Sequence, residues 1–236
     1  MEACIGEDRI IAFVDVIGWR SALKCKGHIW LVQVARSISK HKQQFSSVQE
    51  DQIRTCFEEL EKKSGLMQPK HEEYNDIKFS FVSDSFIISS SVWNVYSLFN
   101  VTRWACMTLL CDYGFLTRGG IAKGLVTHDT ERDIIVGQPL VDAVHIEKTT
   151  SRPRIEISKS VLDFVYGKND EAEKLIYYDG EKNILNICES GDDWIFACEQ
   201  QIDTGLRDAP EGKSKNKWCY MKCHLKPMRK KLLQIH

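Results

Sequence analysis

Two aspartates interrupt strongly apolar stretches of the chain. Asp15 is the one charge in residues 10–17, IIAFVDVI, a run typical of a central strand. Asp84 lies in residues 77–90, IKFSFVSDSFIISS, beside Ser83 at the polar break between two apolar segments. On its own, Asp84 is most simply a turn residue whose carboxylate caps backbone N–H groups.

A buried carboxylate such as Asp15 requires a partner, because its ionised form is costly away from water. Neither apolar segment carries an evident Lys or Arg that faces the same way. A divalent metal ion shared by Asp15 and Asp84 is therefore the economical interpretation.

The elements around these acids predict an α+β fold. Residues 77–90 predict a hairpin with its turn at Ser83 and Asp84. The first two thirds of the chain predict the order β-α-α-β-β-α-β-β-α, which contains a ferredoxin-like β-α-β-β-α-β core with extra pieces. In that topology, the end of the first strand and the hairpin tip meet at one end of the sheet.

Apolar periodicity and turn residues give the other expected elements. Helices are expected from about residue 29 to 41, over 50–63, over 92–113, from Pro139 to about 148 and over 159–166; strands are expected over 115–127, 134–137, 154–158 and 175–178. Further elements are expected over 184–188 and 194–198, and a basic tail follows.

Length and composition indicate one globular domain over 1–236. Of the 236 residues, 43% are hydrophobic and 28% charged, and the formal net charge is -1. This balance gives no reason to expect nucleic acid or membrane as a partner. The acidic N-terminal segment and the lack of a long apolar run favour a cytoplasmic protein, and the odd number of cysteines, 9, favours reduced thiols.

Four segments resemble class III nucleotide cyclase catalytic domains, most closely the bacterial pyrimidine cyclases of Pycsar anti-phage systems. They are IAFVDVIG, FSFVSDSFIIS, and LTRGGIAKGLV followed by GQPLVDAVHIEK. The resemblance covers about residues 9–157 and leaves about 158–236 as a C-terminal extension. It implies conversion of a nucleoside triphosphate to its 3′,5′-cyclic monophosphate and pyrophosphate.

The resemblance also implies roles for individual residues. Asp15, Asp84 and the backbone carbonyl of Val16 would bind two divalent ions, Mn²⁺ or Mg²⁺. Arg118 would meet the charge that develops on the α-phosphate, and Lys123 is a weaker candidate for the same task.

Base selection in this family falls, by position, on Phe79 or Ser80 and on Asp133. No purine-selecting lysine occupies the first of these slots, since Lys78 is displaced in register. A pyrimidine is favoured, with UTP ahead of CTP by resemblance to the commoner members. The family further implies a homodimer with composite active sites and a separate effector that reads the cyclic nucleotide.

One departure from the purine cyclases leaves alternatives open. Their late helix carries an asparagine and an arginine where this chain has Val141 and His145. An adenylate or guanylate cyclase and a catalytically inactive, nucleotide-binding dimer therefore remain alternatives. A polymerase-palm or diguanylate-cyclase-like enzyme would instead require a Gly-Gly-acid-acid hairpin, which the Ser-Asp-Ser sequence here does not supply.

Overall fold

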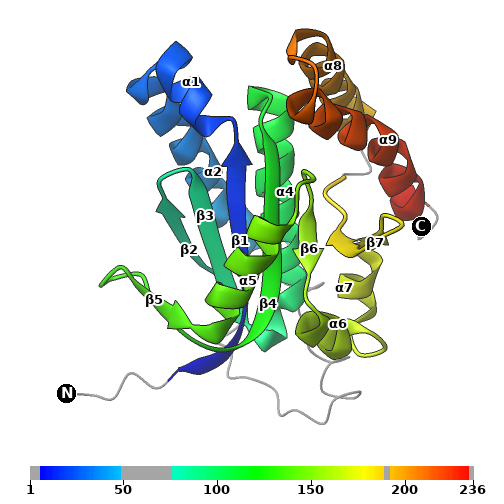
Figure 1. The fold of residues 1–236 in the computed structure, drawn as a ribbon. Helices are drawn as coiled ribbons and strands as arrows, with labels where there is room; N and C mark the ends of the chain where they lie inside the picture. The colour runs from blue at the N-terminus through cyan, green and yellow to red at the C-terminus, as the bar shows by residue number, and fades with distance from the viewer. Residues whose placement is uncertain (1–5, 49–75, 189–191, 234–236) are drawn as a thin grey trace.

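The computed structural model describes residues 6–48, 76–188 and 192–233. These residues form an eight-stranded mixed sheet flanked by helices (Figure 1). The predicted α+β class is confirmed. The expected helix at 50–63 lies outside the described residues.

The elements follow one another in nearly the expected order. The N-terminal part contains β1 (Glu7–Ile17), α1 (Trp19–Lys26), α2 (His28–Val48), β2 (Lys78–Val82), β3 (Ser85–Ser91), the 3-10 helix η2 (Val92–Asn94) and α4 (Val95–Tyr113). The central part contains β4 (Leu116–Asp129), β5 (Ile134–Gly137), α5 (Gln138–Thr149) and β6 (Ile155–Ile157). The C-terminal part contains α6 (Lys159–Val165), α7 (Asp170–Lys174), β7 (Ile176–Tyr178), β8 (Asn183–Leu185), α8 (Asp192–Asp208) and α9 (Lys213–Leu233).

The sheet order is β2-β3-β1-β4-β6-β8-β7, with β5 paired to β4 off this path. Strands β2, β3, β1 and β4 are antiparallel neighbours, as a ferredoxin-like β-α-β-β-α-β core requires. The first strand thus lies between the hairpin and β4, and the predicted core topology is confirmed.

Side-chain alternation along β1 creates two packed layers. Ile10, Ala12, Val14 and Val16 face the main core, to which α2 and α4 contribute. Ile11 and Phe13 face a smaller core that includes Ala143 of α5. Figure 1 shows α5 crossing one face of the sheet while α4 and α2 lie on the other. Asp15 follows Phe13 by two residues, so it lies on the same face of the sheet as α5.

The helix α4 is almost entirely buried, as its apolar residues on every side predict. It ends at Gly114, which adopts a left-handed conformation with φ 68. This helix separates the sheet from the C-terminal helix α8, so its residues contact both.

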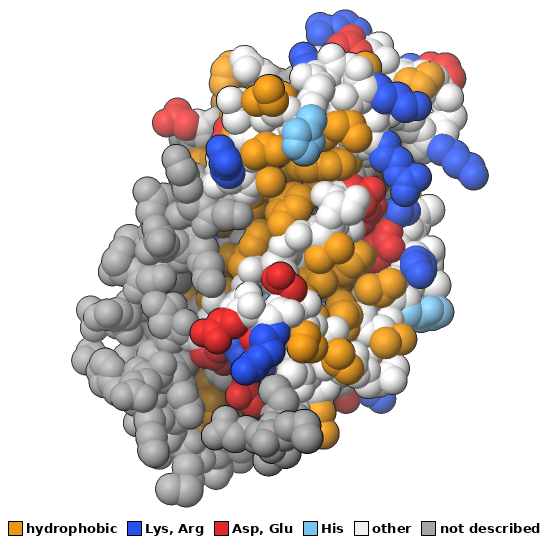
Figure 2. Space-filling view, turned by 90° about the vertical axis from the view of Figure 1, so that its left-hand side faces the viewer, with side chains coloured by type: hydrophobic (Ala, Val, Ile, Leu, Met, Phe, Trp, Pro, Cys, Tyr) orange, Lys and Arg blue, Asp and Glu red, His pale blue; other side chains and the backbone are white. Residues whose placement is uncertain are grey.

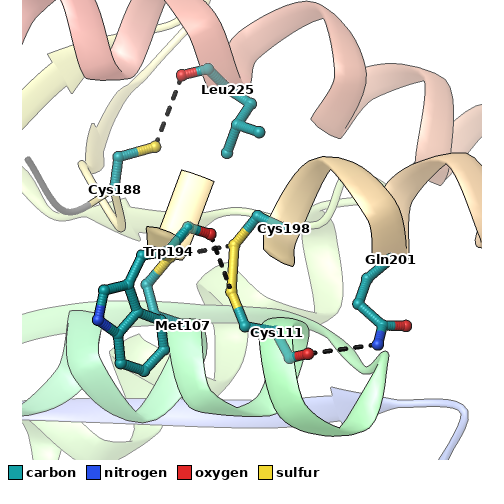
Figure 3. Close-up of a disulfide and its surroundings, with 7 residues drawn as sticks. All are labelled: Met107, Cys111, Cys188, Trp194, Cys198, Gln201 and Leu225. Carbon is teal, nitrogen blue, oxygen red and sulfur yellow. Dashed lines mark hydrogen bonds between the residues drawn. A yellow bond between two sulfur atoms is a disulfide. The ribbon is translucent and has the colours of Figure 1, made fainter. Parts of the chain in front are cut away.

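The cysteine prediction requires a correction. Cys111 of α4 and Cys198 of α8 form a disulfide, with their Cα atoms 4.8 Å apart (Figure 3). Beside it, Gln201 donates a hydrogen bond of 3.3 Å from Nε2 to the Cys111 carbonyl. The two cysteines are 87 residues apart, and only the packing of α8 on α4 brings them together. Among the described cysteines, Cys25, Cys106, Cys188, Cys219 and Cys223 form no disulfide.

No helix among the described residues is long and apolar enough to cross a lipid bilayer.

Candidate functional site

Asp15 and Asp84 come together at the end of the sheet where β1 ends. Asp15 lies opposite Ser85 in the β1–β3 register, and Asp84 is in the turn immediately before it. The Val16 N–H donates a hydrogen bond of 2.9 Å to the Asp84 carbonyl, which fixes the turn against β1. The side chains of Asp15 and Asp84 are only 18% and 26% exposed. Two half-buried carboxylates therefore share one corner of the sheet.

Burial and like charge act together on Asp15. Burial raises the pKa of Asp15 above its usual range, and the negative charge of Asp84 raises it further, while Arg118 opposes both effects. The Asp84 carboxylate is therefore close enough to act on Asp15 electrostatically. A bound cation would relieve both the burial cost and the repulsion.

Arg118 is a partner of Asp15 that the two apolar segments alone did not reveal. It lies opposite Asp15 in the β1–β4 register, and its Nε donates a hydrogen bond of 3.1 Å to Asp15 Oδ2. Arg118 is 30% exposed, so one side of its guanidinium group remains open. The pairing follows from strand register, because Asp15 and Arg118 are 103 residues apart.

Glu147 completes this group and was not assigned a role from the sequence. An Arg118 terminal nitrogen lies 2.6 Å from Glu147 Oε1, and the Glu147 side chain is only 7% exposed. Burial raises the pKa of Glu147, and Arg118 opposes that rise. The available sequence signal was an acid on the buried face of α5, four residues after the buried Ala143.

The donors at this corner suit a hard divalent cation. Two carboxylates are present. The Val16 N–H points toward the Asp84 turn, and the N–H and C=O of one strand residue point to the same side of the strand. The Val16 carbonyl oxygen therefore also points toward Asp84. Oxygen donors of this kind favour Mg²⁺ or Mn²⁺. Arg20, itself 91% exposed, lies 3.7 Å from Asp84 Oδ2 and can move aside at little cost. No group of three His, Cys, Asp or Glu side chains able to hold a metal occurs within the described ranges.

A basic cavity of about 570 Å³ adjoins Arg118. Its walls come from the loop after α5 and from α9, which lies beyond the same end of the sheet (Figure 1). Arg118 therefore both lines the basic cavity and contacts Asp15 of the carboxylate pair.

The predicted base-binding residues of β2 point to opposite faces of the sheet. The Phe79 ring stacks on Phe86, with centroids 5.6 Å apart and an interplanar angle of 12°, and it packs against the main core. Ser80 faces the other way and makes a hydrogen bond of 3.0 Å with Nε2 of His128, whose Nδ1 lies 2.8 Å from Ser89 Oγ. His128 is buried, and sequence reasoning did not select it.

Two further predicted residues lie away from Asp15. Lys123 is five residues beyond Arg118 on β4 and therefore faces the opposite side of the sheet, where its Nζ lies 2.7 Å from Asp8 Oδ2 and over the Phe164 ring. Asp133 lies in the β4–β5 turn with φ 55, far along β4 from Arg118. Within one chain, neither residue is brought to the carboxylate pair.

The glycines of β4 are required by packing of the protein itself. A Cβ on Gly119 would lie 2.1 Å from the Phe13 carbonyl oxygen, and one on Gly120 would lie 2.5 Å from that of Ala143. Gly120 thus allows α5 to approach β4 closely, which places Glu147 over Arg118.

No protein-family model and no curated protein matches the sequence. Among solved structures, the chain is similar to the monomeric guanylyl cyclase domain of the RhoGC fusion protein from the aquatic fungus Blastocladiella emersonii, at 13% identity over 77% of this chain and 95% of that chain, with a TM-score of 0.41. It is similar to a bacterial light-regulated adenylyl cyclase at 12% identity, over 84% of this chain and 57% of that one, with a TM-score of 0.44. It is also similar to a class III adenylyl cyclase-like ATP-binding protein from Pseudomonas aeruginosa at 11% identity, over 93% and 44% of the two chains, with a TM-score of 0.40. At these identities and TM-scores, the function has to be argued from the side chains.

Proposed function

We propose that this protein is a nucleotide cyclase that converts a pyrimidine nucleoside triphosphate, UTP in preference to CTP, into its 3′,5′-cyclic monophosphate and pyrophosphate. The observation that carries the proposal is the pair formed by Asp15 and Asp84 at one corner of a ferredoxin-like sheet, with Arg118 against Asp15. Oxygen donors beside an arginine suit the transfer of a phosphoryl group held by divalent ions.

In the proposed reaction, the ribose 3′-hydroxyl loses its proton to solvent and its oxygen forms a bond to the α-phosphorus. The bond from that phosphorus to the bridging oxygen of pyrophosphate breaks. Asp15, Asp84 and the Val16 carbonyl would hold two divalent ions, which when bound acidify the 3′-hydroxyl and neutralise the triphosphate. Arg118 holds Asp15 through Nε and offers its open side to the α-phosphate oxygens. Glu147 orients Arg118.

The preference for a pyrimidine is supported by the sequence resemblance and by the small polar groups at the predicted base position. Ser80 is held by His128, so a hydroxyl and an imidazole face the α5 side of β2. Phe79 packs into the main core on the opposite face of the sheet, so Ser80 is the better placed of the two predicted base-binding residues. Asp133 and Lys123 would contact the substrate only if a partner subunit brought them beside the carboxylate pair.

A homodimer is the natural setting for such a divided site. Arg118 and Asp15 lie at one end of β4, whereas Asp133 lies beyond the other end. A second copy in the opposite orientation would place one copy's base-binding residues beside the other's carboxylates. By resemblance to the Pycsar cyclases, the cyclic nucleotide would act as an anti-phage signal that a separate effector protein reads.

The test is a product assay. The purified protein is incubated with each of the four ribonucleoside triphosphates and Mn²⁺ or Mg²⁺, and the products are identified by mass spectrometry. We expect a cyclic pyrimidine monophosphate and pyrophosphate from the wild type, and neither from Asp15→Ala or Asp84→Ala. A cyclic purine monophosphate as the main product would instead favour an adenylate or guanylate cyclase.

A second candidate is a nucleotide-binding dimer without catalysis. It is favoured by Val141 and His145, which are exposed on α5 at the positions where purine cyclases carry an asparagine and an arginine. Nucleotide binding without a cyclic product from any of the four triphosphates would select this candidate.

A further inference from the structure

The basic cavity beside Arg118 contains side chains from two regions that are distant in sequence. Five of its lining residues are cationic: Arg118, Lys148, Arg152, Lys213 and Lys217. No acidic side chain among the described residues lines it. Its volume of about 570 Å³ lies within the usual range for small-ligand sites.

Three of these five cations have no ion-pair partner in the part of the chain that the structure describes, whereas Arg118 pairs with Asp15 and Glu147. Arg152 has an acid partner, with its guanidinium 2.9 Å from Glu181. Lys148, Lys213 and Lys217 form no ion pair with the residues that the structure describes. Burial lowers the pKa of Lys217, and the nearby charge of Arg118 lowers it further. An anion in the cavity would relieve this repulsion.

Helix α9 presents one face to the cavity. Lys213, Asn216, Lys217 and Tyr220 all line it, at the spacing of one helical face. Lys213 is the first residue of α9, so the positive end of the helix dipole also lies at the cavity.

Buried and partly buried hydrogen bonds hold α9 against the sheet. The Tyr220 hydroxyl donates a hydrogen bond to Asp179, which also accepts one of 2.7 Å from Arg154 beside β6. Further along α9, Asn186 donates a hydrogen bond of 2.9 Å to the Met228 carbonyl. The cationic face of α9 is therefore a fixed wall of the cavity, in contrast to a solvated run of lysines.

We propose that this cavity binds the polyphosphate part of the substrate, and that Lys213 and Lys217 of the C-terminal extension hold the departing pyrophosphate. This inference rests on the proposed function, because Arg118 joins the cavity to the carboxylate pair. Arg118 lines the cavity and also donates a hydrogen bond to Asp15, so a polyphosphate in the cavity would adjoin the carboxylate pair.

The test measures binding of inorganic tripolyphosphate to the full chain by calorimetry, in EDTA and without nucleotide. We expect the Lys213→Gln/Lys217→Gln variant to bind at least about ten-fold more weakly than the wild type. The matched control is Lys215→Gln/Lys222→Gln, which removes two charges from the same helix where they pair with Glu211 and Asp203. We expect this control to bind tripolyphosphate like the wild type.

Equal weakening in both double variants, or no weakening in either, would overturn the inference. Lys213→Gln alone provides a second variant, because Lys213 is exposed and its loss leaves the packing of α9 intact. Inorganic monophosphate should bind more weakly than tripolyphosphate, and equal affinities would argue against a polyphosphate site.

The experiments test the cyclase proposal and the polyphosphate-site proposal independently of each other. If tripolyphosphate binding depends on Lys213 and Lys217 but no triphosphate gives a cyclic product, the anion site stands and the cyclase proposal falls. If a cyclic product forms and the Lys213→Gln/Lys217→Gln variant keeps the wild-type KM and affinity for pyrophosphate, only the cavity assignment falls.

Discussion

Asp15 is held in an electrostatically unfavourable position. Its carboxylate is half-buried, lies at the same corner of the sheet as that of Asp84, and is only partly compensated by Arg118. Such an arrangement costs stability in the absence of a cation, and it persists where function needs the charge.

We therefore predict that Asp15→Asn stabilises the metal-free protein and abolishes catalysis. The amide keeps the shape of the side chain but removes the charge that burial and Asp84 disfavour. Differential scanning fluorimetry in EDTA should show a higher thermal midpoint than for the wild type, and added Mn²⁺ should raise the midpoint of the wild type only. A lower midpoint for Asp15→Asn in EDTA would contradict this account of Asp15.

The raised pKa of Asp15 predicts that the stability of the metal-free protein depends on pH. Because the folded-state pKa of Asp15 is raised above 3.8, the folded state holds this proton more tightly than the unfolded state does. The stability that this proton provides is complete below the ordinary Asp pKa and is lost as the pH rises through the raised value. The excess stability of metal-free Asp15→Asn over the wild type should therefore grow with pH in that window, as measured by urea unfolding at a series of pH values. A difference that stays constant with pH would contradict the raised pKa.

Glu147 is predicted to act by positioning Arg118. Its charge competes with Asp15 for the Arg118 guanidinium, so Glu147→Gln should lower the pKa of Asp15 and move the acid-side fall of the activity profile to lower pH. We also expect about a ten-fold loss of kcat, because Arg118 loses its second anchor. Asp142→Asn, on the exposed side of α5, should change neither quantity. A loss of kcat with an unshifted pH profile would indicate a merely structural role for Glu147.

At the scale of elements, the hairpin and β1 position the acids because their register is set by side-chain alternation. That part could be predicted from the sequence, since Asp15 and the Ser83-Asp84 turn each interrupt an apolar pattern. The contact between Arg118 and Glu147 could not, because it depends on how closely α5 approaches β4. The helix α9 was predicted only as a basic tail, since its apolar contacts are sparse among lysines.

The approach of α5 to β4 can be tested at Gly120. A methyl group at Gly120 would collide with the Ala143 carbonyl and with Ile146, so Gly120→Ala should displace α5. We expect a loss of about 1–3 kcal/mol in the free energy of unfolding, measured by urea denaturation, together with reduced cyclase activity. Gly6→Ala is the control, because its new Cβ would lie an ordinary 3.7 Å from Leu125. Full stability of Gly120→Ala would show that α5 does not depend on this close approach.

At the scale of the whole molecule, the β4–β5 pair has an exposed apolar surface that the proposed homodimer could cover. Leu125, Ile134 and Val136 lie on one face of the β4–β5 pair and are 67%, 43% and 65% exposed. Figure 2 views the molecule from the side on which β2 and β5 lie in Figure 1, and hydrophobic side chains are exposed along the middle of that view. A second copy of the chain is the partner that the proposed function requires here.

We predict that Leu125→Lys breaks the proposed homodimer. Light scattering after gel filtration should report a dimer for the wild type and a folded monomer for the variant, which should also lose cyclase activity because each site would be incomplete. Ile29→Lys changes a residue that is 77% exposed on α2 and should leave the dimer intact. A monomeric wild type with full activity would contradict the divided site.

The central claim is that Asp15 and Asp84 jointly bind divalent ions beneath the substrate phosphates. Electron paramagnetic resonance of Mn²⁺, titrated into the protein with a non-hydrolysable UTP analogue, tests this directly. The account predicts saturable Mn²⁺ binding to the wild type that is lost in Asp15→Asn and in Asp84→Asn. Wild-type Mn²⁺ binding in either variant would contradict it.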